Sequence, residues 1–131
     1  MRLLLDTHVW IWSLLEPERL WKRAVEALGS DSNEIWLSPI SVWETLILIE
    51  RGRLEVDAEP GHWVRGALEA APLREAPLTH EVSLLSRRLR LRHADPADRF
   101  LGATAIAYDL TLVTADDRLR RSKDLAVLPY R

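Results

Sequence analysis

Short apolar segments that end abruptly in polar residues alternate with segments of helical pattern along this chain of 131 residues. The first, Leu3-Leu4-Leu5, is followed at once by Asp6 and Thr7. Such uninterrupted apolar runs are typical of strands that are buried on both faces. Strands alternating with helices in a short chain predict an α/β layered fold with a mostly parallel sheet. We expect strands near residues 2–5, 34–37, 73–76, 111–114 and 126–128.

Helical patterns occupy the segments between these strands, and helix-breaking residues bound several of them. Pro17 ends the first helix, Gly29 the second and Gly52 the third. A chain of this length fits one domain with its own core, so residues 1–131 are predicted to form a single domain. The expected helices span residues 8–15, 18–28, 39–51, 62–71, 79–91, 95–108 and 117–121.

Composition excludes several classes of protein. The chain contains no cysteine, which rules out disulfides, thiolate zinc sites and cysteine nucleophiles. No apolar run approaches the ~20 residues that cross a bilayer, and Asp6 and His8 interrupt the N-terminus where a signal peptide would be apolar. No Gly-rich nucleotide-binding loop, Gly-x-Ser-x-Gly motif or metal-binding histidine spacing is present. We therefore expect a cytoplasmic protein without a membrane partner.

Four acidic residues are expected to meet at one edge of the sheet. Asp6 follows the first strand, and Asp116 follows the strand that ends at Thr114. Glu44 and Asp98 lie early in helices that open toward the same edge. In open α/β sheets this edge, at the carboxyl ends of the strands, is where ligands bind. Asp6 and Asp116 also suit the N-cap of the helix that follows each of them, so a structural role stays open for both.

Glu44 has two possible helical registers. With Ser38 as N-cap and Pro39 at the first helical position, Glu44 lies in the second turn, and no basic residue is among its neighbours three or four positions away. A capping box from Ser41 to Glu44 would instead begin the helix later. In the first register, a carboxylate on a largely apolar face requires a proton, a metal ion or a distant partner.

The segment Asp95-Pro96-Ala97-Asp98 has a structural interpretation as well. Asp95 suits a helix N-cap, and Asp98 lies at the third helical position, near the positive end of the helix dipole.

Four converging carboxylates are costly, because two of them ~5 Å apart repel by roughly 3 kcal/mol at an effective dielectric constant of ~20. An ionised quartet without sulfur or clustered histidine therefore indicates a hard cation, Mg²⁺ or Mn²⁺.

Four short motifs, in this order, resemble those of PIN-domain proteins and, more narrowly, of VapC-type toxins from bacterial toxin–antitoxin pairs. They are Leu4-Leu5-Asp6-Thr7-His8, Ser41-Val42-Trp43-Glu44, His93-Ala94-Asp95-Pro96-Ala97-Asp98-Arg99 and Leu112-Val113-Thr114-Ala115-Asp116. The resemblance implies a three-layer α/β/α fold and assigns catalysis and metal binding to Asp6, Glu44, Asp98 and Asp116. It gives supporting roles to Thr7, Asp95 and Thr114. Asp109 departs from the family, which often has Gly between this helix and strand.

The same resemblance implies an endoribonuclease that cleaves phosphodiester bonds of cellular RNA through a metal-activated water. It further implies a small antitoxin partner and a homodimer. Two alternatives remain at the level of sequence. One is a catalytically inactive PIN-like RNA-binding or scaffold protein, against which the four intact acids argue. The other is a phosphotransfer α/β domain, whose haloacid dehalogenase form would need a second Asp where this chain has His8.

Basic and aromatic residues are unevenly distributed. Residues 1–86 carry an acidic excess and residues 87–131 a basic one, a pattern that suits an anionic partner for one face. Trp10, Trp12 and Trp21 lie close together in sequence, and an exposed remainder of this group would indicate a protein interface. The predicted RNA-binding residues are Arg87, Arg88, Arg90, Arg92, Arg118, Arg120, Arg121 and Lys123.

Overall fold

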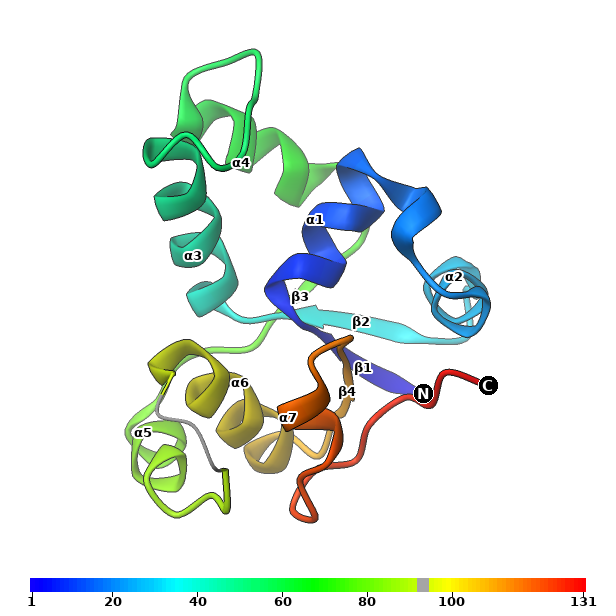
Figure 1. Cartoon of the computed structure of the whole chain (residues 1–131), viewed down its shortest axis with the longest axis vertical. Coiled ribbons are helices and arrows are strands. Elements are labelled where there is room, and N and C mark those ends of the chain that lie inside the picture. Colours follow the sequence, from blue (N-terminus) through cyan, green and yellow to red (C-terminus); the bar gives the residue numbers. More distant parts are fainter. Residues whose placement is uncertain (92–94) are drawn as a thin grey trace.

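The computed structural model describes residues 1–91 and 95–131, and within these ranges the chain forms a four-stranded parallel sheet in the order β3-β2-β1-β4 (Figure 1). Leu4 in β1 is opposite Trp36 in β2 and Leu112 in β4, so the first strand lies in the middle of the sheet. The predicted parallel α/β sheet is therefore confirmed. The strands are β1 (Arg2–Leu5), β2 (Glu34–Leu37), β3 (Arg74–Glu75) and β4 (Thr111–Val113).

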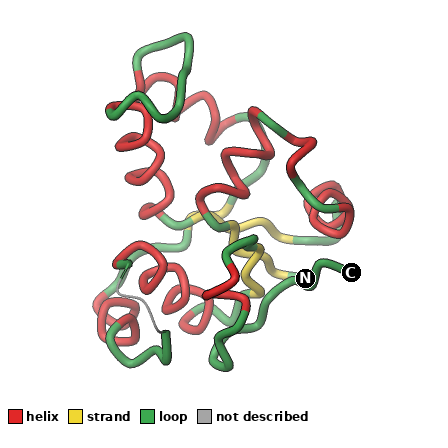
Figure 2. The backbone as a smooth tube through the Cα atoms, viewed as in Figure 1, coloured by secondary structure: helices red, strands yellow, loops and turns green. Residues whose placement is uncertain are grey.

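Helices cover both faces of this sheet (Figure 2). They are α1 (Thr7–Leu15), α2 (Lys22–Gly29), α3 (Pro39–Glu50), α4 (Pro60–Glu69), α5 (His80–Ser86), α6 (Pro96–Ala107) and α7 (Asp117–Arg120), with a 3₁₀ turn, η1, at Pro17–Arg19. No helix in the described part of the chain is long and apolar enough to cross a membrane.

The middle strand supplies both hydrophobic cores. Leu3 and Leu5 pack in a core with residues of α1, α2 and α4, whereas Leu4 packs in a second core with residues of α5, α6 and α7. Successive side chains of a strand point to opposite faces, so one apolar run anchors both helical layers. This arrangement confirms the three-layer α/β/α architecture.

The helix predicted for residues 18–28 is divided in the structure. Leu20 and Trp21 have extended backbone, with ψ angles of 139° and 158°, and α2 begins only at Lys22. The extended conformation places the indole of Trp21 against the C-terminal segment, where its Nε1 donates to the Pro129 carbonyl at 3.3 Å and its ring meets the Tyr130 ring edge-on. Tertiary packing has overridden a local helical preference.

The helix predicted for residues 79–91 ends at Ser86. Beyond it, the guanidinium of Arg99 in α6 donates hydrogen bonds to the carbonyls of Ser86, Leu89 and Leu91, at 2.9, 3.3 and 3.2 Å. These bonds satisfy carbonyls that no longer have helical partners. The sequence motif that surrounds Arg99 gave no indication of this role.

Two local features flank β4. Asp109, in the turn before the strand, has a φ of 55°, in the left-handed region that Asp tolerates better than most residues, which explains why glycine also suits this position. The predicted last strand at 126–128 forms only a bridge between Val127 and Leu112. It continues the sheet by a single residue pair beyond β4.

Candidate active site

Asp6 follows β1 directly, and its carboxylate is buried. It occupies the N-cap position of α1, but its side chain makes no capping hydrogen bond. Instead, Oδ2 accepts a hydrogen bond of 2.6 Å from the hydroxyl of Thr114, which is fully buried just after β4. Burial raises the pKa of Asp6, because the charged carboxylate has lost water. Capping does not explain this side chain.

Thr114 also connects Asp6 to Asp116. The Thr114 hydroxyl accepts the backbone N–H of Asp116 at 3.0 Å while it donates to Asp6. One buried side chain thus fixes the two acids that follow the neighbouring strands β1 and β4. This contact joins residues more than 100 positions apart, since Asp6 and Thr114 are separated by 108 positions.

Glu44 lies in α3 in the first of the two predicted registers. Ser38 is the N-cap, and its side chain accepts the Ile40 N–H, so the alternative capping box is wrong. Oε1 of Glu44 accepts a hydrogen bond of 2.5 Å from the Thr7 hydroxyl, which lies 2.9 Å from the hydroxyl of Ser41. Burial is the main reason that the pKa of Glu44 is raised.

Ser41 is a site residue that the sequence reasoning did not single out. It is fully buried and contacts Thr7, the residue that holds Glu44. Ser41 precedes Glu44 by three positions, so the two lie on the same face of the helix. That spacing was a usable signal once the register of α3 was known.

Asp98 lies in the first turn of α6 and is partly buried. Burial raises its pKa, and the negative charges of Asp95, Asp6, Asp116 and Glu44 raise it further, to about 7. All four predicted site acids are therefore close enough to interact electrostatically. Asp95 is the N-cap of α6 and accepts the N–H groups of Ala97 and Asp98, as its structural interpretation predicted.

Asp116 differs from Asp6 and Glu44 because it has both backbone N–H donors and an arginine as partners. It is the N-cap of α7, and its Oδ1 accepts the N–H groups of Arg118 and Leu119. Its Oδ2 also forms an ion pair of 3.2 Å with the Arg118 guanidinium. Burial raises the pKa of Asp116, but these hydrogen bonds and the charge of Arg118 outweigh burial and leave the pKa lowered.

The predicted RNA-binding residues separate into several groups. Arg87, Arg88, Arg121 and Lys123 are exposed. Arg90 and Arg118 pair with Asp124 and Asp116, whereas Arg92 lies outside the described residues. Arg120 is engaged in the fold: it donates to the carbonyls of Thr114 and Leu128, and its guanidinium lies 3.6 Å from the centre of the Tyr130 ring. Arg120 therefore holds the C-terminal segment in place.

Trp10, Trp12 and Trp21 leave no fully exposed remainder near the N-terminus. Trp10 is buried in the core, Trp12 lies under the Arg19 guanidinium at 4.4 Å, and Trp21 is covered by Tyr130. The exposed tryptophan is Trp43, with 55% of its surface accessible. It lies on α3 next to Glu44, because the helical register that buries Ser41 turns Trp43 outward.

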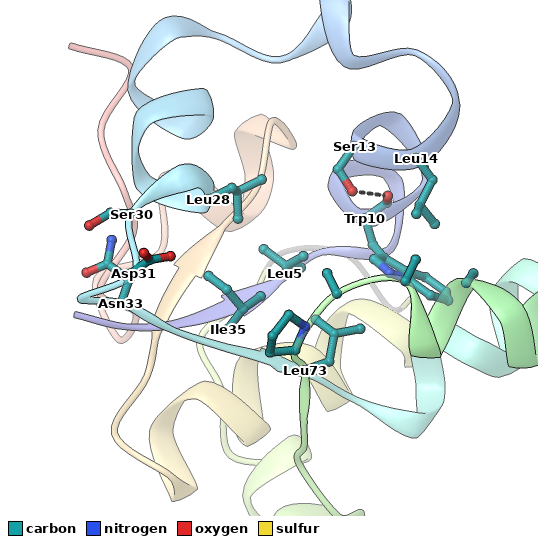
Figure 3. A pocket seen from close by; sticks show the side chains of 14 residues that line it. Leu5, Trp10, Ser13, Leu14, Leu28, Ser30, Asp31, Asn33, Ile35 and Leu73 are labelled. Carbon is teal, nitrogen blue, oxygen red and sulfur yellow. Dashed lines mark hydrogen bonds between the residues drawn. The ribbon is translucent and has the colours of Figure 1, made fainter.

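An apolar cavity of about 460 Å³ lies away from the acids, between α1, α2, β2 and the end of α4 (Figure 3). Its apolar wall includes Leu5, Trp10, Leu14, Leu28, Ile35 and Leu73. Ser30, Asp31 and Asn33 lie together at one end of it. None of its described lining residues is one of the four acids, so two separate features need explanation.

The acid cluster consists of oxygen donors alone, held by hydroxyl groups on opposite sides of β1. Among the residues that the structure describes, neither Asp6 nor Glu44 has an ion pair with Lys or Arg. In these same ranges, no three Asp, Glu or His side chains already form a group that could hold a metal ion. The carboxylates are close enough to repel one another, but they do not surround a common point as the ligands of a bound ion would.

Comparison with known proteins gives one consistent result. Residues 3–125 match a family described as PIN domain. The chain is 35% identical over 118 residues to Ribonuclease VapC22 of Mycobacterium tuberculosis, covering 89% of this chain and 88% of that protein.

Solved structures of the same fold were also found. VapBC2 from Rickettsia felis, bound to a DNA fragment from its promoter, aligns with a TM-score of 0.72 at 17% identity and 98% coverage of both chains. FitAcB from Neisseria gonorrhoeae aligns with a TM-score of 0.67 at 25% identity, covering 98% of this chain and 97% of that one.

Proposed function

This chain belongs to the PIN-domain family, and on that premise we propose that it is a metal-dependent endoribonuclease that acts as the toxin of a toxin–antitoxin pair. The observation that carries the proposal is the set of four acids at the carboxyl edge of the sheet. Asp6 is buried, forms no ion pair with Lys or Arg within the described ranges, and is held by a hydroxyl group rather than by a cap. A fold does not retain such a carboxylate for stability alone.

We propose that Asp6, Glu44, Asp98 and Asp116 hold Mg²⁺ or Mn²⁺. The donor set fits these ions, because it offers carboxylate oxygens without sulfur or imidazole. The raised pKa values of Asp6, Glu44 and Asp98 point the same way, since burial makes the ionised form of each carboxylate less favourable and a bound cation would stabilise it. When bound, such an ion lowers the pKa of a water molecule and neutralises charge on a phosphodiester.

The residues around the acids would then orient them. Thr114 fixes the face of Asp6, and Thr7 with Ser41 fixes Glu44, so each carboxylate presents a defined oxygen to the site. Side-chain rotations would bring the carboxylates together once a cation reduces their repulsion.

Metal removal tests this function. Purified chain should cleave single-stranded RNA in Mg²⁺ or Mn²⁺, and cleavage should stop in EDTA and return when the ion is restored. Zn²⁺ should support little cleavage, because the site lacks imidazole and thiolate ligands. Cleavage that survives thorough chelation would refute the metal-dependent mechanism.

We propose a small antitoxin as protein partner, because the chain resembles a named VapC ribonuclease. The apolar face of an antitoxin helix would pack at the cavity lined by Trp10 and Leu14, as amphipathic segments pack in apolar grooves. Expression of the chain alone should arrest growth, and co-expression of the proposed antitoxin should restore it. Normal growth with abundant folded chain would contradict the toxin role.

A homodimer is proposed on the basis of α3. This helix is strongly apolar, yet only Ser41 and Thr45 are fully buried in it, and Trp43 is largely exposed. A second copy packed on this face would cover Trp43 and bring a neighbouring chain close to Glu44. Light scattering should give twice the chain mass, and Trp43→Glu should shift the chain to a monomer.

A further inference from the structure

Three arginines converge on a cavity of about 370 Å³ beside the acid cluster. Its described lining residues are Arg90, Arg118, Arg121 and Ser122, and we call this feature the arginine pocket. Arg118 belongs to α7, Arg121 and Ser122 follow that helix, and Arg90 comes from the segment after α5. Two distant parts of the chain therefore place guanidinium groups around one concave surface.

The arginine pocket and the acid cluster share a wall. The Arg118 guanidinium lies 3.2 Å from Asp116, one of the four acids. This hydrogen bond raises the pKa of Arg118, and the nearby charges of Asp98 and Asp95 raise it further. A polyanion that crossed from one feature to the other would meet positive charge directly beside the proposed metal site.

One side of the arginine pocket is rigidly built. Asp124 accepts the Arg90 backbone N–H at 2.9 Å and two guanidinium N–H groups at 3.0 and 2.5 Å. The backbone N–H of Asp124 in turn donates to the Ser122 hydroxyl at 3.3 Å. This network fixes the loop that carries Ser122 and, next to it, Arg121. It also pairs the charge of Arg90 with that of Asp124.

Arg121 is the cation that this network leaves available. It is exposed, and the described residues contain no ion pair or side-chain hydrogen bond for it. Asp116 and Asp124 offset the charges of Arg118 and Arg90, so Arg121 contributes the uncompensated positive charge of the pocket. Guanidinium groups bind phosphate by paired, charge-assisted hydrogen bonds.

We propose that the arginine pocket binds a backbone phosphate of the RNA strand next to the phosphodiester that is cleaved, with Arg121 as its principal ligand. The assignment rests on the proposed nuclease function for the identity of the strand, and on the pocket itself for the phosphate. Bound there, the strand is held beside Asp116 while its adjacent phosphodiester reaches the acids. The pocket thereby positions substrate without contributing to bond cleavage.

Binding of a fluorescent single-stranded RNA tests the proposal. The Asp6→Asn variant in Mg²⁺ prevents cleavage during the measurement, and fluorescence anisotropy is recorded over a range of salt concentrations. Adding Arg121→Gln should weaken binding roughly tenfold. The slope of log affinity against log salt should also fall by about 0.7, the value for one lost phosphate contact on a single strand.

Arg65→Gln is the matched control. Arg65 is an exposed arginine of α4, outside the arginine pocket, and its replacement removes the same charge. The Arg65→Gln chain should bind the RNA with an affinity within about twofold of the parent. The slope of its log affinity against log salt should be unchanged. Arg121→Lys should retain the slope but bind more weakly than the parent, because it keeps the charge and loses the planar fork. If Asp6→Asn fails to fold, the otherwise unmodified chain in EDTA replaces it.

Three results would overturn the pocket. Equal affinities for the Arg121→Gln and Arg65→Gln chains would show that only overall charge matters. In the second such result, inorganic phosphate displaces RNA more strongly than chloride does at equal ionic strength, while Arg121→Gln leaves RNA binding unchanged. That combination would identify a site for small anions only. An unchanged KM for RNA cleavage by Arg121→Gln would also contradict it. Absence of cleavage by the unmodified chain, with Arg121-dependent binding intact, would refute the nuclease function and leave the pocket standing.

Discussion

Asp6 and Asp116 both follow a strand and both occupy an N-cap position, yet their carboxylates are in opposite environments. Asp6 is buried, caps nothing with its side chain and receives one hydroxyl group, and its pKa is raised. Asp116 caps α7 and pairs with Arg118, and its pKa is lowered. Position in the sequence therefore does not reveal whether an acid serves the fold or is left with unbalanced charge. The neighbouring side chains decide it.

The first prediction tests whether the buried carboxylate of Asp6 is needed for activity. Asp6→Asn keeps the oxygen that accepts from Thr114, so the far-UV circular dichroism spectrum should be unchanged. Cleavage of RNA should fall by at least about a hundredfold, because a proposed ligand has lost its charge. Full activity in the folded variant would show that the buried carboxylate is structural.

The second prediction tests the hydroxyl group that joins the two regions. Thr114→Val removes the donor to Asp6 and the acceptor of the Asp116 N–H while keeping the shape of the side chain. We expect a decrease of roughly ten- to a hundredfold in activity or metal affinity, as for other residues that orient metal ligands. Thr114→Ser should restore most of it. Unchanged activity and metal affinity in the Val variant would show that the hydroxyl does not orient the two acids.

The third prediction concerns stability at Asp116. Asp116→Ala removes the cap of α7 and the ion pair, and should lower the free energy of unfolding by about 1 kcal/mol. Asp116→Asn retains capping and should cost little stability, although activity should still fall. Denaturant titration of both variants separates the two roles. Asp117→Asn is the control, and a larger loss of activity there than at Asp116 would move the assignment by one residue.

The smallest effect is expected at Glu44. Its pKa is raised mainly by burial, so the ionised carboxylate is less favourable in the folded chain than in the unfolded one. Glu44→Gln should therefore raise the melting temperature of the chain in EDTA by roughly 3 °C, while activity in Mg²⁺ falls. Glu26→Gln, at an exposed position in the middle of α2, should change neither. A lower melting temperature for Glu44→Gln would show that the carboxylate stabilises the fold through Thr7.

Local chemistry in the sequence was enough to predict the order of strands and helices and several boundaries. Ser38 and Pro39 begin α3, Asp95 caps α6 and Asp116 caps α7, because caps and breakers act on the next few residues of the chain. The apolar run of β1 predicted a strand covered on both faces, because successive side chains of a strand point to opposite faces of the sheet. The four acids could be proposed together because parallel strands bring their carboxyl ends to one edge.

The partners of each side chain were decided by the tertiary structure. The sheet order places β1 between β2 and β4, and only this order brings Thr114 to Asp6. Packing of the C-terminal segment interrupts a helix at Trp21 and turns Arg120 into a structural residue. Arg118 contacts Asp116 within one short helix, yet whether it pairs with an acid or faces solvent depends on how α7 lies on the sheet. A sequence records which groups a chain carries, whereas burial and charge compensation depend on which segments become neighbours in space.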